Sequence, residues 1–66
     1  MKKTQILPAV RQGYPVAEAA QQIGVSRALA FKLIASGRLR SFRVGRRRLV
    51  SAEAIRDFIH AAEAAA

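Results

Sequence analysis

The residues best suited to bind a ligand are eight basic side chains between positions 27 and 48, a segment that contains no acid. They are Arg27, Lys32, Arg38, Arg40, Arg43, Arg46, Arg47 and Arg48. Outside this segment four basic residues balance four acidic ones, so the segment accounts for the whole net charge of +8. Charge confined to one third of a domain makes a basic surface, which attracts polyanions by releasing their condensed counterions. Nucleic acid is therefore the first partner to consider.

Catalytic chemistry has little support in the sequence. The only histidine, His60, has no serine or cysteine partner at a recognisable spacing, and the chain has no cysteine. The acids Glu18, Glu53, Asp57 and Glu63 are spread along the chain, which is typical of helix caps and solvated faces rather than of a carboxylate pair or a metal site. We therefore predict no enzyme activity, no catalytic residue, no metal, no cofactor and no small-molecule ligand.

Length and composition limit the fold to one small domain. A chain of 66 residues buries only about 60% of the surface that it exposes when unfolded, so its stability should be about 3–5 kcal/mol. The lack of cysteine permits a reducing compartment, and no apolar stretch is long enough for a signal peptide or a membrane span. We expect a cytoplasmic protein without membrane contact. The larger apolar residues expected in its core are Ile6, Leu7, Val16, Ile23, Leu29, Leu33, Ile34, Phe42, Leu49, Ile55, Phe58 and Ile59.

The elements that must position the basic residues begin with two short helices. Apolar residues from Val16 to Ile23 follow helical spacing, and Gly24 supplies a left-handed helix end. Ser26 is a preferred N-cap for a second helix, which ends at Gly37. Because only two residues separate these helices, they cannot run antiparallel and must cross steeply. The pattern predicts a helix-turn-helix.

A hairpin and a third helix follow. Residues 39–50 mix apolar and basic types about Gly45, which predicts a two-stranded wing with Phe42 and Leu49 on one face and Arg43 and Arg48 on the other. Ser51 should cap a third helix, whose stripe of Ile55, Phe58, Ile59 and Ala62 covers the core.

The predicted fold is mainly α with a small β-hairpin: a winged helix-turn-helix of three helices and a two-stranded wing. We assign residues 1–15 to an amino-terminal arm or a short helix over residues 9–12, residues 16–60 to this domain, and residues 61–66 to a fraying alanine-rich tail.

Residues 14–59 resemble a known family of small domains. The marks are the short helix with paired alanines, the GVS turn, the glycine that ends the second helix, the basic strand, the VGRRR tip and the closing helix. Together they resemble the winged helix-turn-helix domains of excisionases, which set the direction of site-specific recombination, and of MerR-type regulators. Two positions depart from the family pattern. Pro15 stands where a serine or threonine often caps the first helix, and Phe31 replaces a common tyrosine, so it cannot donate a hydrogen bond to a phosphate.

The predicted DNA contacts fall in two groups. The second helix should enter a major groove, with Arg27 as the best candidate for guanine readout, Lys32 near a phosphate, and Ser26 capping the helix. The recognition-helix set is Ser26, Arg27, Ala28, Phe31 and Lys32; the wing set is Arg43, Arg46, Arg47 and Arg48; Arg38 and Arg40 are possible phosphate contacts. The wing should follow the backbone or a narrow minor groove. Plainer alternatives stay open: Arg27 could decorate a solvated helix end, Phe31 could be core, the wing charges could protect a strand edge, and Arg38 and Arg40 could neutralise a helix terminus.

The function predicted from these features is sequence-specific binding of double-stranded DNA, in the manner of an excisionase-like architectural factor that bends DNA or of a small transcription regulator. Its further partners would be a site-specific recombinase or more copies of the chain on adjacent sites. The alternative is a protein-interaction adaptor, such as an antitoxin-like or DNA-packaging initiation module. Its interface would be a third-helix stripe of Ile55, Ile59, Ala62 and Ala66. The DNA-binding interpretation requires the wing arginines and the capped second helix to share one side of the molecule.

Overall fold

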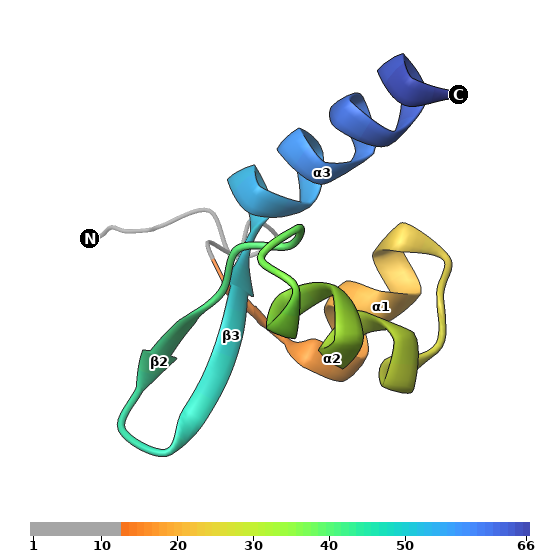
Figure 1. Cartoon of the computed structure of the whole chain (residues 1–66). Helices are drawn as coiled ribbons and strands as arrows, with labels where there is room; N and C mark the ends of the chain where they lie inside the picture. The colour runs from red at the N-terminus through yellow and green to blue at the C-terminus, as the bar shows by residue number, and fades with distance from the viewer. Residues whose placement is uncertain (1–12) are drawn as a thin grey trace, which may run out of the picture.

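A computed structural model describes residues 13–66 of the chain (Figure 1). Its elements are β1 (Gly13–Pro15), α1 (Val16–Ile23), α2 (Arg27–Ala35), β2 (Phe42–Val44), β3 (Arg47–Ser51) and α3 (Ala52–Ala65). The strands form one antiparallel sheet in the order β1-β3-β2. The three predicted helices and the predicted hairpin are confirmed, and β1 is an addition that extends the wing to three strands. The short helix considered over residues 9–12 lies outside the described residues.

Glycines end both helices of the helix-turn-helix, as predicted. Gly24 has a φ of 94° and its N–H donates to the Ala20 carbonyl at 2.8 Å, so α1 ends in the left-handed conformation that glycine adopts without strain. At the end of α2, Gly37 has a φ of 83°. Its N–H donates to Ile34 O and the next N–H, that of Arg38, donates to Leu33 O. This pair of bonds is a Schellman motif, which fixes the direction in which the chain leaves α2.

The hairpin has the predicted register. Phe42 lies opposite Leu49 and Arg43 lies opposite Arg48, so the apolar pair occupies one face of the sheet and the arginine pair the other. Only two residues separate β2 from β3, and the first of them, Gly45, has a φ of 61°. On the outer face the Phe42 ring reaches across the middle strand, because a Cβ added at Gly13 would lie 3.0 Å from its Cζ atom. A side chain at position 13 would therefore make the ring shift by a few tenths of an ångström.

The third helix starts at the predicted cap, and only its first turns pack against the core. Ser51 Oγ accepts a hydrogen bond of 2.9 Å from the Ala54 N–H. Ala54 and Ile55 are buried, Phe58 and Ile59 are half-buried, and every residue from His60 to Ala66 is exposed. Figure 1 shows the last turns of α3 projecting away from α1 and α2. The predicted stripe therefore covers the core only as far as Ile59. Ala62 was wrongly included in that stripe, and fraying of the exposed tail stays a prediction.

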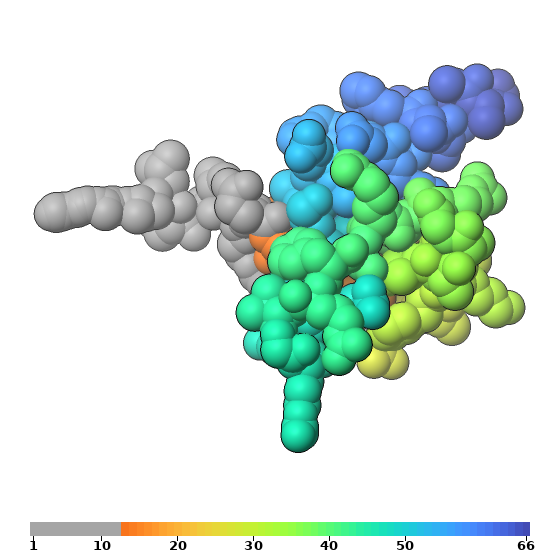
Figure 2. Space-filling model, turned by 60° about the vertical axis from the view of Figure 1, so that its left-hand side comes forward, coloured from red at the N-terminus to blue at the C-terminus, as the bar shows by residue number. Residues whose placement is uncertain are grey.

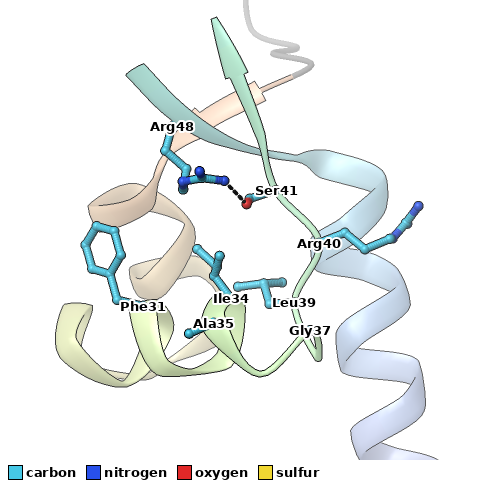
Figure 3. A pocket seen from close by; sticks show the side chains of 8 residues that line it. All are labelled: Phe31, Ile34, Ala35, Gly37, Leu39, Arg40, Ser41 and Arg48. Atoms are coloured by element: carbon cyan, nitrogen blue, oxygen red, sulfur yellow. Dashed lines mark hydrogen bonds between the residues drawn. The ribbon is translucent and has the colours of Figure 1, made fainter. Parts of the chain in front are cut away.

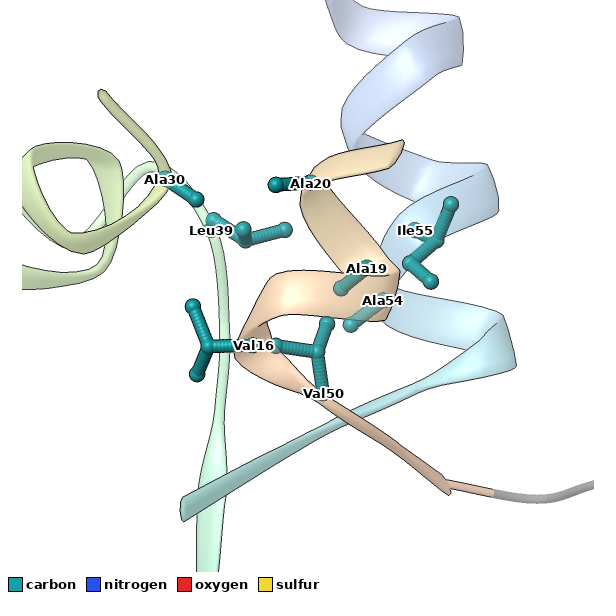
Figure 4. Packing of buried hydrophobic residues seen from close by; sticks show 8 residues of the cluster. All are labelled: Val16, Ala19, Ala20, Ala30, Leu39, Val50, Ala54 and Ile55. Carbon is teal, nitrogen blue, oxygen red and sulfur yellow. The ribbon is translucent and has the colours of Figure 1, made fainter. Parts of the chain in front are cut away.

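The core lies where α1 meets α2, β3 and α3 (Figure 4). Its buried members are Val16, Ala19, Ala20, Ala30, Leu39, Val50, Ala54 and Ile55. Four of these eight residues are alanine, so the elements approach closely and bury few carbon atoms per residue. Close packing of small side chains gives a well-defined arrangement of helices but little stabilising apolar area.

The predicted core was wrong at several positions. Leu29 and Phe42 are exposed at 42% and 41%, whereas Leu39 and Val50, which the prediction left out, are the largest fully buried side chains. Leu39 lies in the loop after α2, where no helical or strand period marks a residue as buried. Phe42 faces the outer side of the sheet, because strand alternation gives the inner side to Val50. Ile6 and Leu7 lie outside the described residues.

Candidate nucleic-acid interface

Helix α2 presents one face to solvent. Its buried side holds Ala30, with Leu33 and Ile34 half-buried against the core. The opposite side consists of Arg27, Ala28, Phe31, Lys32 and Ala35, all exposed. These positions recur at intervals of three to four residues, so they form a continuous stripe along the helix. The stripe contains four of the five residues predicted for the recognition helix.

The fifth predicted residue, Ser26, holds the start of α2. Its Oγ accepts a hydrogen bond of 3.1 Å from the Leu29 N–H, which satisfies an amide that has no partner within the helix. Ser26 itself is exposed. The predicted capping role is confirmed, and it explains the presence of the serine without any ligand.

Arg27 and Phe31 form a stacked pair one helical turn apart. The Arg27 Cζ atom lies 5.0 Å from the centroid of the Phe31 ring, within the range of a cation–π interaction. Phe31 is 39% exposed, so its ring is neither part of the buried core nor free in solvent. The interpretation of Phe31 as core is therefore wrong, and its ring lies beneath the guanidinium group at the start of the helix.

The arginines of the wing surround the turn between β2 and β3. Arg46 is in the turn itself, Arg47 and Arg48 begin β3, and Arg43 lies opposite Arg48. All four side chains are exposed. Since Arg43 and Arg48 share the face of the sheet that also carries the buried Val50, they lie on the side of the sheet that faces the core and the helices.

A groove of about 390 Å³ joins the wing to the start of α2. Its lining consists of Pro15, Val16, Ala17, Arg27, Phe31, Arg46, Arg47 and Arg48. Figure 2 shows the hairpin and α2 side by side on one face of the molecule. Four arginine residues line this groove and no acidic residue does. The start of α2 and the tip of the wing therefore border one groove, which is the arrangement that the DNA-binding interpretation requires.

A second groove, of about 550 Å³, lies on the other side of Phe31 and Arg48 (Figure 3). It is lined by Phe31, Ile34, Ala35, Gly37, Leu39, Arg40, Ser41 and Arg48. Arg48 extends across its upper end and its Nη1 donates to Ser41 Oγ at 2.7 Å. This bond ties β3 to the loop after α2.

The remaining predicted cations lie away from the first groove. Arg40 points toward α3, where its Nη2 lies 2.7 Å from Asp57 Oδ2, and both side chains are 61% exposed. Arg38 is exposed just after the Schellman motif and lines neither groove. Arg43 is also absent from both linings. The structure thus brings together Arg27, Arg46, Arg47 and Arg48 but does not bring Lys32, Arg38, Arg40 or Arg43 into the same groove.

Three contacts of the predicted arginines were missed from sequence. The Arg27–Phe31 pair has the i, i+4 spacing at which helical side chains meet, so the pattern was available. Ser41 and Asp57 had no such signal, because each meets its arginine only after the chain has folded back. The described part of the chain contains no group of acids and histidine that could hold a metal ion. Within residues 13–66, no helix has the length and apolar character to cross a membrane.

Comparison with known proteins agrees with this geometry. A search of curated proteins and a search of solved structures found no match to this chain. A protein-family comparison matches residues 14–63 to the family described as "Helix-turn-helix domain". The match begins in β1 and runs through α1, α2, the wing and most of α3, so it covers every element of the candidate interface. The chain is therefore a member of this helix-turn-helix family, a class of DNA-binding domains that are typically not enzymes.

Proposed function

We propose that this protein binds double-stranded DNA in a sequence-specific manner through α2 and the wing together. The observation that supports the proposal is the groove between them, where Arg27 of the helix and Arg46, Arg47 and Arg48 of the wing meet. In this arrangement α2 lies in a major groove, while the wing follows the adjacent backbone or minor groove. Two elements that grip neighbouring grooves also favour a bent duplex.

The residues of the proposed interface have different roles. Arg27 lies in the first turn of α2, where its planar fork can donate to guanine O6 and N7. Lys32, one turn further along the helix, meets a phosphate, and Ala28 allows the helix to approach the base edges closely. Arg46 and Arg47 at the wing tip bind phosphates or the floor of a narrow minor groove. Phosphate contacts set the affinity and the register, whereas base contacts set the sequence preference.

The biological role that fits best is that of an excisionase-like architectural factor or a small transcription regulator. This part of the proposal rests on the GVS turn and the VGRRR tip, which resemble those of excisionases and MerR-type regulators, and on the two-element grip. Action in the cytoplasm, on DNA sites shared with a recombinase or with further copies, belongs to the same proposal. Fluorescence transfer between dyes at the two duplex ends tests the architectural role, since an architectural factor should shorten the end-to-end distance and a simple blocking protein should not.

Selection of bound duplexes from a randomised pool tests sequence-specific binding directly. We expect a preferred sequence, and affinity for it that falls with salt at a logarithmic slope of about −4 to −7, at about −0.9 per neutralised phosphate. A slope near zero, or no enrichment of any sequence, would contradict the proposal. The spacing of repeats in the selected duplexes would also report how many copies bind.

An adaptor function has one observation in its favour, the exposed end of α3. Residues from His60 to Ala66 are exposed, and they project beyond the rest of the described chain. Ile55, however, was predicted to belong to this interface and is buried in the core. The partner surface would therefore be reduced to Ile59, Ala62 and Ala66. Binding through such a surface would depend only weakly on salt, so the salt titration separates the two functions.

A further inference from the structure

We propose that Phe31 is a positioning residue for sequence readout, acting through Arg27. The inference rests on the proposed function, because it concerns how α2 distinguishes one DNA sequence from another. The observation behind it is the stack of the Arg27 guanidinium on the Phe31 ring, 5.0 Å from Cζ to centroid. Both residues line the groove between α2 and the wing.

An unsupported arginine at the start of a helix is a poor reader of bases. Its long side chain has many rotamers, and holding one of them costs entropy each time DNA is bound. Arg27 is exposed, and none of the described hydrogen bonds or ion pairs involves its side chain. The Phe31 ring is thus the described contact that orients the guanidinium plane. Pre-orientation lowers the entropic cost of binding and favours the geometry in which both donors meet one guanine.

Core packing does not by itself account for the placement of Phe31. The ring is 39% exposed on the solvent-facing side of the helix, and it is neither a buried member of the core nor one of the half-buried residues packed against it. Phenylalanine also has a lower helix propensity than leucine or alanine, so helix formation does not require it. A role as a platform for Arg27, which lies one turn earlier in the helix, accounts for both the aromatic ring at position 31 and its exposure.

The test compares the wild type with five variants, among them Arg27→Ala, on two duplexes, the sequence selected by the wild-type chain and a scrambled one. The quantity measured by fluorescence anisotropy is the ratio of the two affinities. Phe31→Leu should lower this ratio about 2- to 30-fold, the range expected for a cation–π contact that becomes desolvated on binding. Phe31→Tyr, which keeps the ring, should preserve it. Phe42→Leu, which removes an equally exposed ring from the outer face of the wing, is the matched control and should also leave the ratio unchanged.

The double variant Arg27→Ala, Phe31→Leu shows whether Phe31 acts through Arg27. Once Arg27 is removed, loss of the ring should lower the ratio no further, because the two residues work as a unit. An equal loss in both backgrounds would mean that Phe31 contacts a base by itself, for instance a thymine methyl, and would overturn the inference. If the wild type shows a high ratio and Phe31→Leu leaves that ratio unchanged, the inference about Phe31 is overturned but the proposed sequence-specific function is not. If the wild-type ratio is near one, both the inference and the proposed function are overturned.

A measurement on the free protein gives a second, DNA-independent check. Protons that lie over an aromatic ring resonate upfield, so the Arg27 side-chain protons should be shifted upfield in the wild type and in Phe31→Tyr. The shift should be absent in Phe31→Leu. Unshifted Arg27 protons in the wild type would show that the stack does not form in solution and would overturn the inference.

Discussion

At the scale of single residues, the chemistry of this protein is that of arginine held in defined positions. Arg27 stacks on Phe31, Arg48 donates to Ser41, and Arg40 pairs with Asp57. Each contact restricts a side chain that would otherwise sample many rotamers. Arginine suits this arrangement, because its planar fork can stack on one face and still present donors at its edge.

Replacing Arg27 tests the predicted base reader. Arg27→Ala should narrow the affinity gap between the selected and the scrambled duplex by about 5- to 150-fold, which corresponds to the 1–3 kcal/mol of a bidentate base contact. Lys32→Ala, a change of the same charge one turn further along α2, should weaken binding to both duplexes alike. Equal losses on both duplexes for Arg27→Ala would remove it from the readout role. Parallel anisotropy titrations at one salt concentration measure both variants.

At the scale of elements, the positions of the helix and the wing depend on short local signals. Serine caps start α2 and α3, glycines end α1 and α2, and Gly45 allows the two-residue turn at the wing tip. Such signals depend on neighbouring residues, which is why the helices and the hairpin could be predicted from sequence. β1 could not, since a three-residue strand has no periodicity and exists only through its pairing with β3.

The wing tip should supply phosphate contacts without sequence preference. Arg46→Ala and Arg47→Ala should each weaken binding to both duplexes by a similar factor and reduce the logarithmic salt slope by about 0.9. Arg56→Ala, which removes the same charge from α3, should leave the slope nearly unchanged. Titrations at several salt concentrations provide the slopes. A wing variant with an unchanged slope would show that its arginine meets no phosphate.

The ion pair between Arg40 and Asp57 should restrain the arginine more than it stabilises the fold. Because both side chains are 61% exposed, Asp57→Asn should change the free energy of unfolding by less than about 1 kcal/mol. It should also release Arg40 toward DNA, giving tighter binding and a steeper salt slope. Glu63→Gln removes the same charge from the exposed end of α3 and is the control. If both variants gain the same affinity for DNA, the gain comes from net charge alone, and the release of Arg40 is contradicted.

At the scale of the whole molecule, a very small core holds α2 and the wing in one orientation. Half of the buried residues are alanine, and Leu39 and Val50 are the largest fully buried side chains. Leu39 lies between α2 and the wing in sequence, and Val50 lies in β3.

Truncating Leu39 should accordingly be among the most damaging changes. Leu39→Ala should cost about 2–5 kcal/mol of unfolding free energy, comparable to the whole stability expected of a domain of this size, about 3–5 kcal/mol. Leu33→Ala, at a half-buried position, should cost less. Urea unfolding followed by circular dichroism compares the two. A smaller loss for Leu39→Ala than for Leu33→Ala would contradict the packing described here.

The sequence by itself determined the helices, the hairpin register and the identity of the basic surface, because caps, glycines, periodicity and charge are properties of neighbouring residues. It therefore predicted that Arg27 and the wing arginines matter. Only the tertiary structure decided which of them meet. The groove joins Arg27 to Arg46, Arg47 and Arg48, while Arg40 turns away to Asp57. Contacts between residues far apart in the chain depend on how the whole core packs, and no local pattern encodes them.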